Sequence, residues 1–206
     1  MFKKIKISRK RLEIAVAFGL ISAILLSVSS FNASCDDLRT NILRLHIIAN
    51  SDSKEDQALK LKVRDEILEK TGNLFNETEN LTDAKEKVSN SLQVFEKIAN
   101  KVILENGYSY SAKATIGMAD FDTREYEDFT LPAGEYPSLI ITLGEGKGQN
   151  WWCVVFPAVC VPAAAKHDLS ETAKEKSTAV AKNPQRYIMR FKTVEIYEKI
   201  KNLLNK

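Results

Sequence analysis

Three carboxylates stand close together after an apolar run: Asp52, Glu55 and Asp56. Carboxylates at such spacing are able to act as general acid and general base in hydrolysis. The same residues also fit the start of a helix, because Asp52 precedes Glu55, and Ser53 precedes Asp56, by the three residues of a capping box. Negative charge in a first helical turn also complements the helix dipole. We interpret the carboxylates as helix-start residues, and a hydrolase that uses Asp52, Asp56 or Cys153 is the alternative.

A glycine-rich loop, residues 144–150, directly precedes Trp151 and Trp152. A P-loop needs G-x-x-x-x-G-K-[ST], but here Lys147 lies between glycines and no hydroxyl residue follows it. A dinucleotide-binding turn needs G-x-G-x-x-G, and Gly148 comes one residue too early for it. We therefore expect a tight backbone path that positions the tryptophans. Their aromatic surface suits a protein–protein contact as well as a protein core, and the sequence leaves both open.

Metal ligands and activated nucleophiles have no recognisable pattern in the sequence. The two histidines, His46 and His167, are far apart, and the chain has no C-x-x-C pair. Cys153 lies in an apolar run without a nucleophile elbow, where a structural cysteine is the usual case. The sequence therefore predicts no catalytic residue, no metal site and no cofactor, and a protein that is not an enzyme.

The N-terminus has the pattern of a secretory signal or a signal anchor. Six basic residues within positions 3–11 precede an apolar run, Ile14–Phe31. The basic block stays in the cytoplasm, so the chain after it is exported. Residues 1–34 are predicted to be a signal peptide or signal anchor, with residues 12–31 in the membrane, and residues 35–206 to be the exported domain.

Whether this segment is cleaved stays open at the level of sequence. Small side chains end at Ser30, as a signal peptidase requires, yet the apolar run approaches the roughly 20 residues of a membrane-spanning helix. The residues before Cys35 also resemble a lipoprotein cleavage site, although Asn32 stands where such sites usually place leucine. The segment also carries the basic charge: the whole chain is +3, residues 1–34 are +5, and residues 35–206 are −2. No basic domain remains that would indicate nucleic-acid binding.

The exported part reads as one α+β domain, with an antiparallel sheet packed against two or three helices. Alternating or continuous apolar residues predict strands, and apolar residues three and four apart predict helices. Polar composition predicts a mobile loop over residues 161–186. The elements expected in chain order are a strand over 41–49, a helix from 53 to about 70, a helix over 83–106, strands over 108–118, 124–131 and 138–143, a strand-like run at 151–157, and a helix over 187–204 with one apolar stripe (Ile188, Phe191, Val194, Tyr197, Ile200 and Leu204).

Three stretches together resemble the stage II sporulation protein R family of endospore-forming Firmicutes. They are LRLHIIANSDS with EDQALKLKVRD at residues 43–65, LPAGEY at 131–136, and GEGKGQNWWCV at 144–154. They occur in the family's order and bracket residues 43–160. The resemblance implies an exported signalling protein with no catalytic residues. The family is made in the forespore and triggers a membrane-embedded aspartic protease of the mother cell, which removes the pro-segment of sigma-E.

The resemblance also directs the choice of site residues. Cys153 and Cys160 could be free thiols or a disulfide on spacing alone; they match the family's cysteine pair, which implies a disulfide. Either the glycine loop with its tryptophans or the turn after the first strand is expected to contact the protease. The contact residues expected are Asn50, Ser51, Asp52, Gly146, Lys147, Trp151 and Trp152. An exported hydrolase and a structural adaptor at the wall or membrane are the alternatives.

Overall fold

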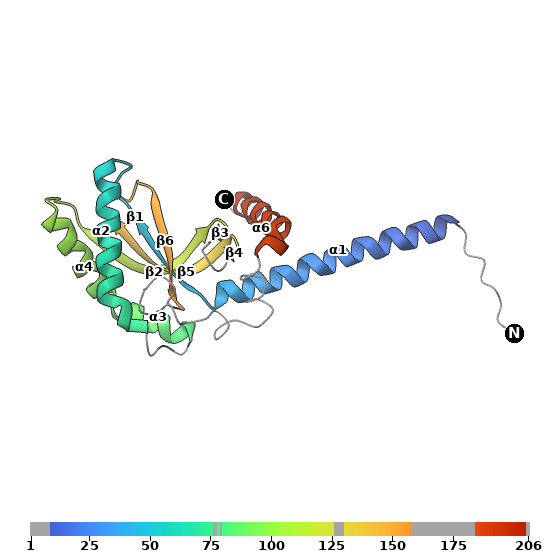
Figure 1. Ribbon diagram of the computed structural model, residues 1–206, viewed down its shortest axis with the longest axis horizontal. Helices are drawn as coiled ribbons and strands as arrows, with labels where there is room; N and C mark the ends of the chain where they lie inside the picture. Colours follow the sequence, from blue (N-terminus) through green and yellow to red (C-terminus); the bar gives the residue numbers. More distant parts are fainter. Residues whose placement is uncertain (1–8, 76–77, 79, 126–129, 158–183, 205–206) are drawn as a thin grey trace.

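The computed structural model describes residues 9–75, 78, 80–125, 130–157 and 184–204 (Figure 1). A long N-terminal helix projects away from a domain in which helices cover a twisted sheet. The elements are α1 (Arg9–Thr40), β1 (Leu43–Ile48), α2 (Lys54–Thr71), the 3₁₀ helix η1 (Gly72–Phe75), α3 (Leu81–Asn90), α4 (Leu92–Glu105), β2 (Ala112–Phe121), β3 (Arg124–Glu125), β4 (Thr130–Leu131), β5 (Gly134–Leu143), β6 (Asn150–Phe156) and α6 (Pro184–Leu204).

The main sheet has four strands in the order β2-β5-β1-β6. The α+β class is confirmed, but the expectation of an antiparallel sheet is wrong for one pair, because β1 runs parallel to β5. The reason is the helical crossover: α2, α3 and α4 separate β1 from β2, and β5 then returns antiparallel to β2 and enters beside β1. Parallel neighbours need such a long connection. The chain passes from β2 to β5 by way of β3 and β4, and the loop of residues 144–149 joins β5 to β6.

One face of the sheet packs against α2, α3 and α4. Leu43, Leu45 and Ile47 of β1 are buried on this face, as the alternating pattern predicted. The helices contribute apolar residues at helical spacing, among them Phe95 and Val102 of α4. These residues form the larger hydrophobic core, and β1 lies in its middle.

The helices confirm most of the predicted boundaries. Ser53 caps α2, since its Oγ accepts a hydrogen bond from the backbone N–H of Asp56 at 3.1 Å. The helix predicted over residues 83–106 is interrupted at Ser91, whose N–H bonds the carbonyl of Val88 and so ends α3 before α4 begins. Gly107 follows α4 with a φ of +80°, the left-handed conformation expected of a glycine after a helix.

The strand and loop predictions need more correction. The strand predicted over residues 108–118 begins at Ala112 and runs to Phe121, and the weak candidate over 124–131 is a small separate hairpin of β3 and β4. The predicted mobile loop over 161–186 falls outside the described residues except at its end, where α6 already begins at Pro184. Of the stripe predicted for this helix, Phe191 and Val194 are buried, whereas Tyr197, Ile200 and Leu204 are exposed, because α6 packs beside α1 and not on the main core.

The other face of the sheet carries a second, smaller core. It contains Leu38 from the last turns of α1 and Ile42 from the connection to β1, together with Phe121, Leu131, Tyr136 and Val154. Arg44 of β1 is buried beside this cluster, and its guanidinium carbon lies 3.7 Å from the centre of the Phe121 ring. A guanidinium over an aromatic face is an attractive arrangement. The N-terminal helix therefore supplies part of the domain's interior.

Leu45 tests the position of β1 at the centre of the larger core. Truncation of this buried side chain in Leu45→Ala should lower the free energy of unfolding by about 2–5 kcal/mol, since it leaves a cavity between sheet and helices. Chemical denaturation of the full chain in detergent, followed by circular dichroism, measures the change. Lys113→Ala, on an exposed position of β2, is the matched control and should change stability by less than about 0.5 kcal/mol. Equal effects of the two variants would contradict the assignment.

Candidate functional site

The turn after β1 and the glycine loop before β6 lie against each other at one end of the sheet. Backbone hydrogen bonds join them: Lys147 N–H donates to the carbonyl of Asn50 at 3.1 Å, and Gly148 N–H donates to the carbonyl of Ala49 at 2.9 Å. The side chain of Asn50 adds a third link, because its Oδ1 accepts from Glu145 N–H at 2.9 Å. The two alternative contact regions predicted from sequence are therefore one surface, which we call the turn–loop surface (residues 50–53 and 144–150).

Asp56, in the first turn of α2, connects the parts of the turn–loop surface by hydrogen bonds. Its Oδ2 accepts hydrogen bonds from Asn50 Nδ2 at 2.8 Å and from Ser51 Oγ at 2.5 Å. Its Oδ1 accepts from the hydroxyl of Tyr110 at 2.7 Å, which reaches across from the segment before β2. The carboxylate is buried. Because hydrogen bonds to a charged group are among the stronger ones, this carboxylate fixes the turn, the helix start and the Tyr110 segment relative to one another.

The charge state of Asp56 follows from these contacts. Burial raises the pKa of the Asp56 carboxyl, but the hydrogen bonds from Ser51, Asn50 and Tyr110 outweigh burial and hold the pKa below its ordinary value of 3.8. Burial, together with the bond to this carboxylate, raises the pKa of the Tyr110 hydroxyl. The tyrosine therefore stays a donor and the aspartate an acceptor at neutral pH. A carboxylate in this state is poorly suited to act as a general acid.

Two glycines of the loop are needed for its close approach to the turn. Gly144 has a φ of +55°, and a Cβ there would overlap the side-chain oxygen of Asn50. Gly148 lies against the backbone of the turn, where a Cβ would be 2.5 Å from the carbonyl carbon of Ser51. Gly146, with a φ of +62°, turns the loop between them. The glycine-rich composition thus allows the loop to lie directly against the turn, a contact that the sequence did not predict.

Two further contacts join the loop to the turn and to α2 through Gln149. The backbone N–H of Gln149 donates to Asp52 Oδ1 at 2.7 Å, and its carbonyl accepts from Lys60 Nζ at 2.9 Å. Lys60 is buried, and burial lowers its pKa, although the nearby Asp52 carboxylate acts in the opposite direction. Lys147 and Glu145 form an ion pair of 2.7 Å at the tip of the loop, with 75% and 69% of their side chains exposed. The tip of the loop is therefore open to solvent and accessible to a partner.

The two tryptophans point to opposite faces of β6. Trp151 pairs with Ile47 and packs against the larger core, with the guanidinium carbon of Arg64 5.0 Å from its ring centre. Trp152 pairs with His46 and packs against the smaller core, with the guanidinium carbon of Arg124 4.1 Å from its ring centre. Both are half-buried. Each tryptophan is thus partly a core residue, and its contact with a partner protein stays a prediction.

Cys153 lies on the helix-covered face of β6 and is buried. Its predicted partner Cys160 falls outside the described residues, so the disulfide stays a prediction. The burial of Cys153 explains why it has no features of a reactive thiol. Among the described residues no group of three or more histidine, cysteine or acidic side chains is arranged to hold a metal ion.

Sequence reasoning missed Tyr110 and Gln149 as parts of the site. Tyr110 was assigned to a strand because it stood in an alternating apolar pattern, but β2 begins two residues later and leaves the tyrosine to reach Asp56. Gln149 acts through its backbone groups, which have no signature in the residue type. Asp56, considered as a catalytic candidate, is instead the centre of the hydrogen-bond network.

The profile of the family described as stage II sporulation protein R matches residues 39–166, more than half of the chain. The chain belongs to the stage II sporulation protein R family. It is 33% identical over 141 residues to the stage II sporulation protein R of Bacillus subtilis (strain 168), a match that covers 66% of this chain and 63% of that relative. No solved structure matches the chain.

The part of the chain that matches the stage II sporulation protein R family contains the whole turn–loop surface. It begins at Arg39, in the last turn of α1, and so includes the sheet, α2, α3 and α4 but not α6. The three motifs quoted for the resemblance fall on β1 with α2, on the turn between β4 and β5, and on the loop with β6. Two of the three therefore meet at the turn–loop surface.

Replacement of Asp56 by asparagine tests the network and gives a pH dependence of known sign. A carboxyl whose pKa is lower in the folded than in the unfolded chain stabilises the fold above its ordinary pKa of 3.8, and this stabilisation is lost as the pH falls through the lowered value. Asp56→Asn should therefore cost about 2 kcal/mol or more at pH 7, and the difference from the natural chain should shrink below about pH 4. Denaturant unfolding of the full chain at several pH values measures it. Glu55→Gln, exposed in the same helical turn, is the control, and a pH-independent difference for Asp56→Asn would contradict the charge state assigned here.

Gly148→Ala tests the contact between the two backbones. The added methyl group would overlap the Ser51 carbonyl, so this variant should lose about 1–3 kcal/mol of unfolding free energy as loop and turn separate. Gly117→Ala in β2 is the matched control, since the nearest atom to its Cβ, Cδ1 of Ile140, is 3.8 Å away, an ordinary contact. The control should be as stable as the natural chain or slightly more so. Amide hydrogen exchange of residues 147–149 should speed up in Gly148→Ala alone, and unchanged exchange there would contradict the close contact.

Proposed function

We propose that this protein is an exported signalling protein of endospore formation. In this proposal it activates the membrane-embedded aspartic protease that processes pro-sigma-E in the mother cell. Membership of the stage II sporulation protein R family supports the role in sporulation. The matched region covers 63% of the Bacillus subtilis relative, and the activity and the partner are carried over to this chain as parts of the proposal.

The observation that carries the proposal is the locked turn–loop surface. Two segments almost a hundred residues apart are joined by backbone and side-chain hydrogen bonds around a buried carboxylate. Such a surface is rigid before it meets a partner, so little conformational entropy is lost on binding. Its tip presents Glu145 and Lys147 to solvent, which suits specific recognition by polar contacts. A preformed ligand surface is what an activator of another protein requires.

Activation would follow from differential binding. A protease that exchanges between inactive and active states is shifted toward the state that binds the turn–loop surface more tightly. A signalling protein of this kind needs no catalytic group of its own. The geometry favours this function over the alternative hydrolase, because Asp56 is occupied by three donors and Cys153 is buried in the sheet.

Export is supported by α1. The helix has a mean hydropathy of 2.3 in its most apolar window, lies near the N-terminus and is long and apolar enough to cross a membrane. Arg9, Lys10 and Arg11 at its beginning support a cytoplasmic position for that end, because basic residues next to a membrane-spanning segment favour the cytoplasmic side. In the proposal the domain is thus on the far side of the forespore membrane, facing the mother cell.

The proposal is tested in an endospore-forming bacterium whose own gene for this protein is deleted. The full chain should restore pro-sigma-E processing, and Lys147→Glu should reduce the restored processing at least about tenfold, the effect of roughly 1.4 kcal/mol of lost affinity. The reason is charge reversal at the exposed tip, where the ion pair adds little to stability. Immunoblots of the precursor and mature sigma factor measure the outcome.

Lys97→Glu is the matched control, since it reverses an exposed lysine on α4, a helix that contacts α2, α3 and β2, and it should process normally. Normal processing in the deletion strain itself would contradict the signalling function. Normal processing with Lys147→Glu would contradict the turn–loop surface as the contact, and hydrolysis of a peptide or cell-wall substrate by the purified chain would favour the alternative.

A further inference from the structure

We propose that α1 is docked into the exported domain, with Arg39 held by the turn Pro132–Gly134, so that the membrane helix and the domain form one rigid unit. The turn belongs to the LPAGEY motif, which the proposed function leaves without a role. This inference goes beyond the proposed function, because it concerns how the domain sits on its own membrane and does not depend on the identity of any partner.

The length of α1 exceeds what a membrane needs. Its 32 residues extend about 48 Å at the rise of an α-helix, whereas the hydrocarbon core of a bilayer is about 30 Å thick. The large apolar side chains between Leu12 and Leu26 are exposed where described, as expected of a surface that meets lipid. From Phe31 onward the pattern changes, and Phe31, Cys35 and Leu38 are buried. The surplus length of the helix is therefore the part that contacts the domain.

Apolar contacts hold this surplus segment on two sides. On one side Phe31 and Cys35 pack against Phe191 and Val194 of α6, and the Phe31 and Phe191 ring centres are 5.3 Å apart in an edge-to-face arrangement. On the other side Leu38 enters the smaller core of the sheet. Burial of these large apolar side chains stabilises the contact, because it removes their surface from water. The end of α1 is thus part of the interior of the domain.

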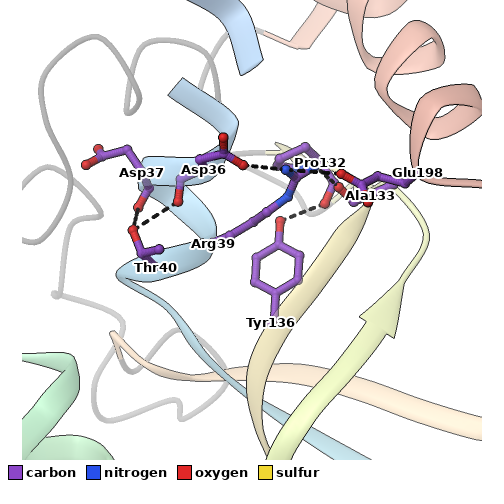
Figure 2. Close-up of polar contacts among 8 residues, drawn as sticks. All are labelled: Asp36, Asp37, Arg39, Thr40, Pro132, Ala133, Tyr136 and Glu198. Carbon is purple, nitrogen blue, oxygen red and sulfur yellow. Dashed lines mark hydrogen bonds and ion pairs between the residues drawn. The ribbon is translucent and has the colours of Figure 1, made fainter. Parts of the chain in front are cut away.

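Arg39 adds a specific polar lock (Figure 2). Its Nη2 donates to the carbonyl oxygen of Ala133, and its Nη1 lies 2.7 Å from Asp36 Oδ1 and 3.5 Å from Glu198 Oε1. Only 11% of the Arg39 side chain is exposed, and 10% of that of Glu198. One guanidinium therefore joins three elements: α1, the turn before β5, and α6. Its planar, multidentate donor geometry suits such a site better than an ammonium group.

The turn is shaped to receive the guanidinium. Gly134 has a φ of +139°, and a Cβ there would lie 2.7 Å from Cζ of Arg39, so the absence of a side chain makes room for the arginine. The buried hydroxyl of Tyr136 donates to the carbonyl of Pro132 at 2.6 Å and fixes the turn from inside (Figure 2). In this reading the LPAGEY motif is a binding site for the arginine of the chain's own membrane helix.

The connection between α1 and the sheet leaves no room for a hinge. Only Asn41 and Ile42 separate the end of α1 from the first residue of β1, and Ile42 is buried in the smaller core. Asn41 caps the helix by donating from its Nδ2 to the carbonyl of Asp37 at 2.7 Å. Helix, core and strand are therefore continuous. A lipid on Cys35 would require a side chain whose exposed fraction is 0% to leave the interior, so the geometry favours a retained helix over a lipidated cysteine.

Cys35 is a natural reporter of this docking. The full chain is produced in bacterial spheroplasts and treated with N-ethylmaleimide, and labelling of Cys35 is followed by peptide mass spectrometry. We expect Cys35 to be protected in the natural chain and to label at least about tenfold faster in Arg39→Ala and in Glu198→Ala. Glu135→Ala, which removes an exposed carboxylate from the same motif, is the matched control and should leave Cys35 protected. The membrane fraction should contain the full-length chain.

Each contrary outcome overturns the proposal. Recovery of a chain that begins at Phe31 would show that the helix is not retained, and rapid labelling of Cys35 in the natural chain would show that it is not docked. Protection of Cys35 that persists in a folded Arg39→Ala variant would contradict the lock. A loss of the circular dichroism signal in Arg39→Ala would mean that this variant does not fold. The labelling of Cys35 in Glu198→Ala then tests the lock, because Glu198 lies on α6, outside the main core. Unchanged labelling there overturns the lock as well. None of these readouts depends on pro-sigma-E processing, so failure of the docking and failure of the signalling function are distinguishable.

Discussion

The buried carboxylate of Asp56 is the interaction on which the candidate surface depends. It is placed by the first turn of α2, and it draws the side chains of Asn50, Ser51 and Tyr110 toward one point. A buried charge is costly unless it is fully hydrogen-bonded, and here the protein donors replace the water that the carboxylate has lost. Because those donors come from two separate segments, the turn after β1 and the segment before β2, the charge can be satisfied only when both are in place. The Asp56 carboxylate can therefore be buried only when the turn–loop surface has this arrangement.

The sheet connects the turn–loop surface to the N-terminal helix α1. β1 lies between β5 and β6, and its alternating side chains belong to the two cores: Leu45 and Ile47 face the helices, and Arg44 faces Phe121 and Tyr136. The smaller core is completed by Leu38 of α1 and by Ile42, which follows the helix, so the domain and the N-terminal helix share an interior. A chain organised in this way has no simple boundary at residue 34, where the sequence alone places the end of the targeting segment.

Local sequence patterns predicted most of the helices and strands. They could not predict which strands pair or which distant residues are in contact. The cap at Ser53, the strand at β1 and the glycine after α4 follow from short-range rules, and the structure has them in place. The parallel pairing of β1 with β5 does not follow from any local pattern, since it depends on where the helical crossover returns the chain. The interruption at Ser91 is equally hidden, because one apolar stripe continues through both helices. Within the site, the proximity of Asn50 to Gly144 joins residues far apart in sequence, and single-sequence spacing carries no information about it.

β1 also sets the distance between the end of α1 and the turn–loop surface. Two residues separate α1 from β1, and the strand stops at the turn–loop surface, so β1 separates that surface from the end of the helix by its own length, up to about 20 Å for six residues (Figure 1). With α1 docked as proposed, the strand and the last turns of the helix hold the turn–loop surface at a fixed distance from the apolar part of α1. Under the proposed function, that distance would limit how far the surface reaches toward a protease in a second membrane, and the length of the strand would then act as a measure of the gap between two membranes.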